Sequence, residues 1–424
     1  MSAQTIELPA MDSKALAPIN WKFPIIYGIL AVISLVGFGL SVGGDVWSGI
    51  SVNTGFSRIQ FAVPSQVTAL VCTVIEIGLG IWAWQLTAAR KKTPVGLPLG
   101  FGFCFVVAFL VRAVAGSEQS LQVTGLLQGT LFLSVPLIFG AMAGCVCEHV
   151  GVINVAIEGQ LLAGAFLAAV VGSLTLNPWL GLLAAPVAGA LVGALLALFA
   201  VRYWVDHIIV GVVLNVLVTG FTSYLFSTVL SEHKDVFAVP TVLPTLPIPG
   251  LSLIPVLGPV LFNQNVLVYI MYAAVVVLQI MLYRSRWGLR MRACGEHPKA
   301  ADTVGIKVNA TRVRNTILGG AIAGLGGAFF TVANGLAFGK EMSAGRGYIA
   351  LAAMILGGWS PRGAVAAALL FGFADNLQNA LSVVGVGIPS QFMLMAPYLI
   401  TIFAVAGFVG KVRPPAQEGQ PYKG

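Results

Sequence analysis

Charge is what this sequence has least of. Only 9% of its 424 residues are Asp, Glu, Lys or Arg, whereas about a quarter is usual in a soluble domain. Hydrophobic residues make up 58% of the chain, more than a soluble domain could cover with so few charges. Charged residues are absent from five long stretches, namely 119–147, 159–201, 236–283, 315–339 and 376–410. Such runs are typical of transmembrane helices, so composition excludes a soluble domain and favours one polytopic membrane unit.

The sequence also lacks the motifs of nucleotide hydrolysis and of common enzymes. The stretch nearest to a phosphate-binding loop, Gly335 to Glu341, is one residue short and lacks the Ser or Thr that would hold magnesium. We find no Ser/His/Asp set, metal-binding helix or Gly-rich dinucleotide turn, and the four His are dispersed. We therefore expect this chain to bind no cofactor itself, and a membrane enzyme is disfavoured.

Cysteine is scarce and forms no framework. The five cysteines are Cys72, Cys104, Cys145, Cys147 and Cys294. Four lie in apolar runs, and the Cys145–Cys147 pair has no further Cys or His at the spacing of a zinc site. Small buried side chains are the better interpretation, and we expect no metal site.

The apolar runs predict an all-α bundle of about ten transmembrane helices. The predicted spans are 23–43, 64–88, 97–115, 124–144, 160–174, 179–202, 207–230, 265–283, 314–335 and 390–410. Residues 1–22 and 411–424 are then tails of a transmembrane domain over 23–410. Three G-x-x-x-G pairs, which begin at Gly140, Gly189 and Gly320, support close helix packing and no more.

Two places interrupt the apolar pattern. The pieces 347–357 and 363–384 are separated by Gly and Pro around Pro361, which is typical of a discontinuous or re-entrant helix. Segment 145–160 is predicted to be a second irregular piece.

Positive charge is concentrated in short connectors. Segment 284–314 carries eight Lys/Arg against two acids, which gives +6 of the net +8 of the chain. Cytoplasmic loops of membrane proteins carry this bias, so 284–314, Arg90 and both termini are expected on the cytoplasmic side of a bacterial inner membrane. No aromatic and basic surface is interleaved, which excludes nucleic-acid binding. The opposite loop, 231–264, contains six prolines and is either a docking surface or a connector.

Segment 284–314 is also patterned within itself. Pro298 and Gly305 bracket KAADTV, which predicts a short helix with Pro at its first position and Gly just past its end. Ala300, Ala301 and Val304 are predicted to form a small apolar face that a partner could contact.

Polar residues inside apolar runs are candidates for a substrate pathway, because burying them in a bilayer is costly. Asn154 and Glu158 are four residues apart and would share one face of a helix. The remaining candidates are Gln160, Asn215, Asp375 and Asn376. A structural role stays open for these candidates. Asn154 and Glu158 could cap a helix break, Asn215 could form an interhelical hydrogen bond, and Asp375 and Asn376 could lie at an exposed helix end. Glu76 is an isolated acid within a span.

Two segments together resemble one family. GVINVAIEGQLLAGAF at 151–166 and RACGEHPKAADTVGI at 292–306 resemble the signature regions of bacterial ABC-importer permeases of the branched-chain amino-acid type. The motif INVAIEGQ is most similar to the corresponding motif of the nucleoside (basic membrane protein-associated) permeases. The resemblance covers roughly 120–410.

The resemblance implies an importer that moves a small polar solute, a nucleoside, into the cytoplasm. It implies cytosolic ATPase subunits that hold ATP and magnesium, a second permease subunit, and a periplasmic or lipid-anchored binding protein. Residues 296–305 would be the coupling helix seated on the ATPase, and the coupling residues would be Arg292, Gly295, Glu296, Pro298, Ala300, Ala301 and Gly305. The alternative is a secondary transporter with broken helices, which would need an ion or proton site, and only scattered acids are present.

Overall fold

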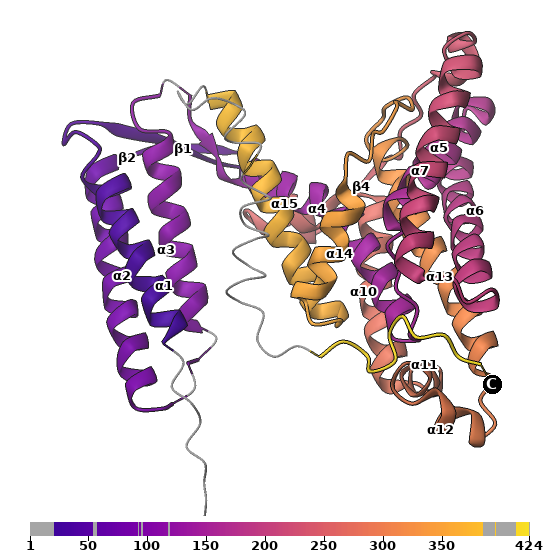
Figure 1. Cartoon of the computed structure of the whole chain (residues 1–424). Coiled ribbons are helices and arrows are strands. Elements are labelled where there is room, and N and C mark those ends of the chain that lie inside the picture. The colour runs from indigo at the N-terminus through magenta and orange to yellow at the C-terminus, as the bar shows by residue number, and fades with distance from the viewer. Residues whose placement is uncertain are drawn as a thin grey trace, which may run out of the picture. The chain divides into compact units, whose positions relative to one another are not determined.

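The computed structural model describes residues 21–53, 57–91, 93–94, 96–117, 119–384, 395 and 413–423. The chain divides into two compact units (Figure 1). The N-terminal unit comprises Met1–Gly49 and Ala62–Gln119, and the core unit comprises Ile50–Phe61 and Ser120–Gly424. The predicted span 390–410, apart from Met395, and the predicted tail over 1–22, apart from its last two residues, lie outside the described residues.

The N-terminal unit is built from three long apolar helices. They are α1 Lys22–Ile33 with a π-helical extension Ser34–Gly39, α2 Ser65–Ala88 and α3 Gly96–Ala113. Tyr27 and Phe101 lie in one of two small buried clusters among its described residues, with their ring centroids 4.7 Å apart. Glu76 of α2 is buried, and its Oε1 accepts a hydrogen bond from the Ser34 hydroxyl at 3.2 Å. Sequence reasoning had assigned no partner to this acid.

The described residues also form five short strands, two of which connect the units. The chain passes between the units in strands β1 Trp47–Asn53 and β2 Arg58–Pro64. Strand β3 Leu121–Gln122 pairs in parallel with β1, with Ile50 opposite Leu121. Strand β4 Thr245–Pro247 pairs antiparallel with β5 Asn263–Asn265.

Helices make up most of the core unit. In chain order they are α4 Val123–Glu148, α5 Ile157–Thr175, α6 Pro178–Ala197 with π-helical Leu198–Arg202, α7 His207–Leu225 with π-helical Phe226–Leu230, α8 Lys234–Phe237, 3-10 helix Leu251–Leu253, α9 Leu257–Leu261, α10 Val266–Arg284, α11 Arg286–Glu296, α12 Pro298–Thr303, α13 Val308–Gly327 with 3-10 Ala328–Phe330, α14 Arg346–Leu356 and α15 Pro361–Val384.

Eight helices in the described part of the chain are long and apolar enough to cross a membrane. They match the first eight predicted spans to within a few residues, which confirms an all-α polytopic membrane bundle. The prediction was less accurate for 314–335, because α13 already begins at Val308 and ends at Gly327. Its first turns carry Arg312 and Arg314, whose charges hid the start of the helix in the apolar pattern.

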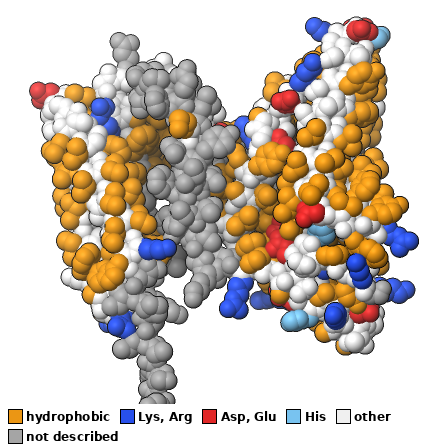
Figure 2. All heavy atoms as spheres, viewed as in Figure 1, with side chains coloured by type: hydrophobic (Ala, Val, Ile, Leu, Met, Phe, Trp, Pro, Cys, Tyr) orange, Lys and Arg blue, Asp and Glu red, His pale blue; other side chains and the backbone are white. Residues whose placement is uncertain are grey.

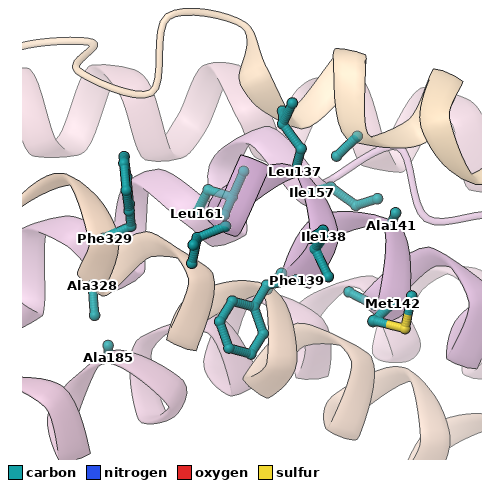
Figure 3. Packing of buried hydrophobic residues seen from close by; sticks show 14 of the residues in the cluster. Leu137, Ile138, Phe139, Ala141, Met142, Ile157, Leu161, Ala185, Ala328 and Phe329 are labelled. Carbon is teal, nitrogen blue, oxygen red and sulfur yellow. The ribbon is translucent and has the colours of Figure 1, made fainter. Parts of the chain in front are cut away.

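Helix α4 lies at the centre of the core unit. Of its most apolar 18-residue window, 89% is buried. Phe139 and Met142 of α4 contribute to one contiguous buried cluster with Leu161 of α5 and Phe329 (Figure 3). Side chains around this helix therefore exclude lipid and water from the middle of the unit.

Glycine permits the closest helix crossing. A Cβ on Gly324 of α13 would lie 2.5 Å from the carbonyl oxygen of Ala185 and 2.8 Å from the Cα of Gly189, both on α6. The backbones therefore touch directly, and two of the three G-x-x-x-G pairs meet at this crossing, as small residues at interfaces permit in membrane bundles.

Both predicted interruptions are present, with one correction of extent. Helices α14 and α15 are separated by Gly357–Ser360, where the Ser360 hydroxyl accepts from the Gly363 N–H at 3.1 Å. The other break is shorter than predicted, because α4 continues to Glu148 and α5 begins at Ile157. The irregular segment is therefore 149–156. Such backbone is tolerated at membrane depth where protein encloses it.

Candidate functional site

A cavity of about 520 Å³ lies in the core unit between α5, α7 and the start of α14. Its polar lining consists of Glu158, Asn215, Thr219, Glu341, Ser343 and Tyr348. Two of the six predicted pathway residues, Glu158 and Asn215, are therefore brought together at one cavity. Small-molecule sites commonly measure about 300–1,000 Å³ and combine apolar walls with a few polar groups.

Glu158 holds the start of α14. Its Oε1 accepts hydrogen bonds from the Ser343 hydroxyl at 2.6 Å and the Gly345 N–H at 2.8 Å, and its Oε2 accepts from the Gly347 N–H at 2.6 Å. Helix α14 has no side-chain cap of its own. A carboxylate from α5 therefore takes up the free N–H groups and faces the positive end of the helix dipole.

Asn215 of α7 supports the same cavity from the opposite wall. Its side-chain oxygen accepts from the Gly159 N–H at 2.8 Å. Its amide donates to the Val155 carbonyl at 2.9 Å and to the Tyr348 hydroxyl at 3.1 Å. The interhelical hydrogen bond expected for this residue is present, and through Tyr348 it also fixes a side chain of the cavity.

The predicted shared face of Asn154 and Glu158 is wrong. Asn154 lies in the irregular segment before α5, so the two residues do not occupy one helix. Asn154 instead forms a reciprocal amide pair with Gln160, at 3.0 Å and 3.2 Å, and both side chains are fully buried. This pair lies at the junction of α4 and α5 and does not line the cavity. Its polar groups can be buried because they hydrogen-bond to one another.

Asp375 and Asn376 contact other helices. Asp375 of α15 forms an ion pair of 3.2 Å with Arg346 at the start of α14. The Asn376 amide donates to the Leu126 carbonyl of α4 at 2.6 Å. Neither residue lines the cavity, so both join helices of the core unit.

Sequence reasoning missed several residues at this site. Thr219, Glu341, Ser343 and Tyr348 line the cavity, and Arg346 lies between Ser343 and Tyr348 in the chain. One signal was available, because Lys340, Glu341 and Arg346 are the only charges between 315 and 350. Charges that interrupt such a long apolar stretch are typical of a functional or paired position.

The predicted short helix is present as α12, and Gly305 follows it with a positive φ of 84°. Helices α11 and α12 lie at one end of the core unit (Figure 1). Several Lys and Arg side chains gather at this end (Figure 2). Pro298 at the first helical position is buried, which fixes where α12 begins.

The predicted apolar face of α12 needs a correction. Ala301 is only 3% exposed and packs with Cys294 and Val308. Val304 is 75% exposed, and Ala300 is exposed as well. The surface available to a partner therefore contains Ala300 and Val304, while Ala301 attaches the helix to α11 and α13.

The residues before α12 face different neighbours. The Arg292 guanidinium lies over the Tyr283 ring, 5.4 Å from its centroid. Gly295 is buried, and a Cβ there would lie 2.4 Å from the carbonyl oxygen of His149. Glu296 is exposed, and its Oε2 accepts from the Ala416 N–H at 3.3 Å. Gly295 thus brings α11 against the end of α4.

Among the described residues, no group of three or more His, Cys, Asp and Glu side chains is arranged to hold a metal ion. What the arrangement offers is a cavity with several polar groups among apolar walls, beside the start of α14, and the short helix α12 with an exposed surface at one end of the core unit. Both features suit transport of a solute with energy supplied from another subunit.

Comparison with known proteins agrees with this arrangement. The family described as branched-chain amino acid transport system / permease component matches residues 126–405. The guanosine ABC transporter permease protein NupQ of Bacillus subtilis is 37% identical over 302 residues, 69% of this chain and 94% of the relative. The nucleoside ABC transporter permease protein NupC of Lactococcus lactis is 38% identical over 306 residues, with the same coverage.

A further relative carries another solute in its name. The putative glucose ABC transporter permease protein TsgC13 of Haloferax volcanii is 34% identical over 256 residues, 60% of this chain and 77% of the relative. No solved structure matches the chain significantly.

Proposed function

We propose that the chain, which belongs to the branched-chain amino acid permease family, imports a nucleoside as the membrane-spanning subunit of an ABC transporter. The relatives that support this proposal are ABC-transporter permeases. The observation that carries the proposal is the match over 94% of two relatives named for guanosine and nucleoside transport. The relative named for glucose is covered over a smaller share of its length.

The cavity supports a neutral polar solute. The Glu158 carboxylate is engaged by three donors of the chain, so it offers a solute little free acceptor capacity. The remaining polar lining is mostly hydroxyl and amide groups, such as Thr219 and Tyr348, between apolar side chains of α5 and α7. Such groups suit the hydrogen-bonding edges and hydroxyls of a nucleoside.

The proposal includes partners and an orientation. Helix α12 would dock on a cytosolic ATPase that holds ATP and magnesium, so both termini would lie in the cytoplasm of a bacterial cell. A second permease subunit and a periplasmic or lipid-anchored binding protein complete the importer. The coupling residues are those of the sequence prediction, with Ala300 and Val304 on the docking surface and Ala301 behind it.

Uptake by the reconstituted complex tests this function. Proteoliposomes that contain the chain with its co-purified subunits and binding protein would be supplied with ATP or with an ion gradient. We expect ATP-dependent uptake of guanosine or another nucleoside, with glucose and branched-chain amino acids as competitors that have no effect. Uptake driven by the ion gradient without ATP would establish the secondary transporter instead. ATP-dependent uptake of glucose would overturn only the choice of solute.

Docking through α12 is tested by one exposed and one control position. Val304→Asp places a charge on the exposed apolar surface and should prevent stimulation of ATPase activity by the loaded binding protein. Lys299→Ala changes an exposed side chain on the same helix and should retain stimulation. Equal behaviour of the two variants would contradict docking through this surface.

A further inference from the structure

The C-terminal segment 413–423 lies outside the part of the chain that matches the family, 126–405, yet it is held firmly against the core unit. Figure 1 shows this segment as a yellow trace that crosses the end of the core unit where α11 and α12 lie. We call it the strap. It contains little regular structure, so its position depends on its contacts with the helices it crosses.

The strap first contacts α11 and α12. The Gln417 N–H donates to the Gly295 carbonyl at 2.9 Å, and the Ala416 N–H reaches Glu296. Tyr422 packs against the cluster of Cys294, Ala301 and Val308, and its carbonyl accepts from the Asn309 side-chain amide of α13 at 3.4 Å. Tyr422 therefore lies behind the exposed surface of α12 and packs against the cluster that attaches this helix to α11 and α13.

The strap also contacts the break between α4 and α5. The Gly419 N–H donates to the Gly151 carbonyl at 3.1 Å. Gly151 has a positive φ of 86°, and a Cβ there would lie 2.8 Å from the Arg312 guanidinium and 3.0 Å from the Gln417 carbonyl. Only glycine allows this conformation and this approach without strain.

Two charged side chains of the core unit complete the attachment. The buried Arg312 guanidinium donates to the Gln420 carbonyl at 2.7 Å. Glu418 interacts with Glu148 at the end of α4, and Glu148 also accepts from the Trp359 indole N–H between α14 and α15. Burial raises the pKa of the Glu418 carboxyl.

We propose that the strap links α12 to the junction of α4 and α5, so that Tyr422 acts as a positioning residue for energy coupling. This inference rests on the proposed docking of α12. A movement of α12 carries Tyr422 with it, and the contacts of Gly419 and Glu418 convey the displacement to Gly151 and Glu148. Helix α5, which holds Glu158 at the cavity, begins six residues after Gly151 in the chain.

The same reconstituted complex tests the strap. Tyr422→Ala removes the contacts with α12 and keeps those with Gly151. We expect basal ATPase activity and subunit composition to persist, while the nucleoside transported per ATP falls about fivefold or more, the lower end of typical coupling between sites. The matched control is Gln420→Ala, which changes an exposed side chain and keeps the backbone carbonyl that Arg312 uses. It should transport as the unchanged protein does.

A second variant keeps the outcome decisive. A chain that ends at 412 removes the whole strap, and it should show the same loss of transport per ATP as Tyr422→Ala. Unchanged transport per ATP in both variants would overturn the proposal, and so would loss of the ATPase subunit from either purified complex, because the strap would then serve assembly. Failure of the unchanged complex to use ATP would instead refute the proposed function.

Discussion

The helices of the N-terminal unit and the two central helices of the core unit, α4 and α5, are buried to very different extents. In each of the three long helices of the N-terminal unit, 28% of the most apolar window is buried, whereas 89% is buried in α4 and 67% in α5. In the core spans that begin with α6, α7 and α10 the buried share is 44%, 33% and 28%. In a unit of three helices, no helix can be surrounded by the others, so each keeps a broad apolar face outward. Among the described residues, the two breaks within apolar helices both occur in the core unit, where surrounding helices shield the backbone groups that the breaks leave free.

The two units also differ in what their polar residues do. In the core unit, Glu158 and Asn215 join α5, α7 and α14 around a cavity. In the N-terminal unit, the buried Glu76 meets the Ser34 hydroxyl through one oxygen, and its other oxygen has no hydrogen-bond partner among the described residues. The family match, 126–405, includes only the core unit. Substitutions should therefore affect the core unit most.

The largest effect is expected at the crossing of α6 and α13. Gly324→Val would place a side chain against the backbone of Ala185 and Gly189, which cannot rotate away. Overpacking typically costs about 1–3 kcal/mol, and we expect at least that loss of stability here. Thermal unfolding of the protein in detergent, followed by size-exclusion chromatography, measures the effect.

The control for this substitution lies on α7. A Cβ on Gly220 would meet nothing within 4 Å, so Gly220→Ala should leave the unfolding midpoint unchanged or slightly raised. A Gly324→Val protein with the midpoint of the unchanged chain would show that the close crossing is not required.

A smaller effect is expected at Glu158. Glu158→Gln replaces one accepting oxygen by an amide that faces donors at the start of α14. Glutamine keeps one accepting oxygen, so we expect a loss of about 1 kcal/mol, that of a typical single hydrogen bond, and stability and nucleoside uptake should fall together. Thermal unfolding and uptake in proteoliposomes measure both.

Glu341→Gln separates support of the helix from contact with the solute. Glu341 is exposed and lines the same cavity. Its substitution should leave the unfolding midpoint unchanged. If Glu158→Gln abolished uptake with an unaltered midpoint, Glu158 would act on the solute and not on α14.

The smallest effect is expected in the N-terminal unit. Glu76→Gln keeps an oxygen that can accept from Ser34 and changes no neighbour of the cavity. Uptake should stay within about twofold of the unchanged chain, and stability within about 1 kcal/mol, as for most substitutions outside such networks. Loss of uptake in a stable Glu76→Gln protein would show that the N-terminal unit takes part in transport, and the contrast between the units would fail.

Much of the bundle could be predicted because span length and charge act locally. Eight spans follow from uncharged runs, and the break before α15 follows from Gly357 and Pro361. The start of α12 follows from Pro298, and its end from Gly305. Each of these signals operates within a few residues of the structure it determines.

The site was less predictable because its contacts join distant parts of the chain. Glu158 binds Ser343 and Gly347, which are 185 and 189 residues away. The helical spacing of Asn154 and Glu158 was correct in sequence, but the break places Asn154 before α5. Ala301 was expected on the exposed face of α12. Its burial depends on Val308 and Tyr422, which lie outside the short segment that predicted this helix.

The amide pair of Asn154 and Gln160 has an electrical consequence. Moving one elementary charge across a membrane potential of 100 mV involves about 2.3 kcal/mol. The junction of α4 and α5 is closed by two neutral side chains, each of which donates to and accepts from the other. A displacement of this pair during transport carries no charge through the field, so these two residues add no voltage dependence to the movement of α5.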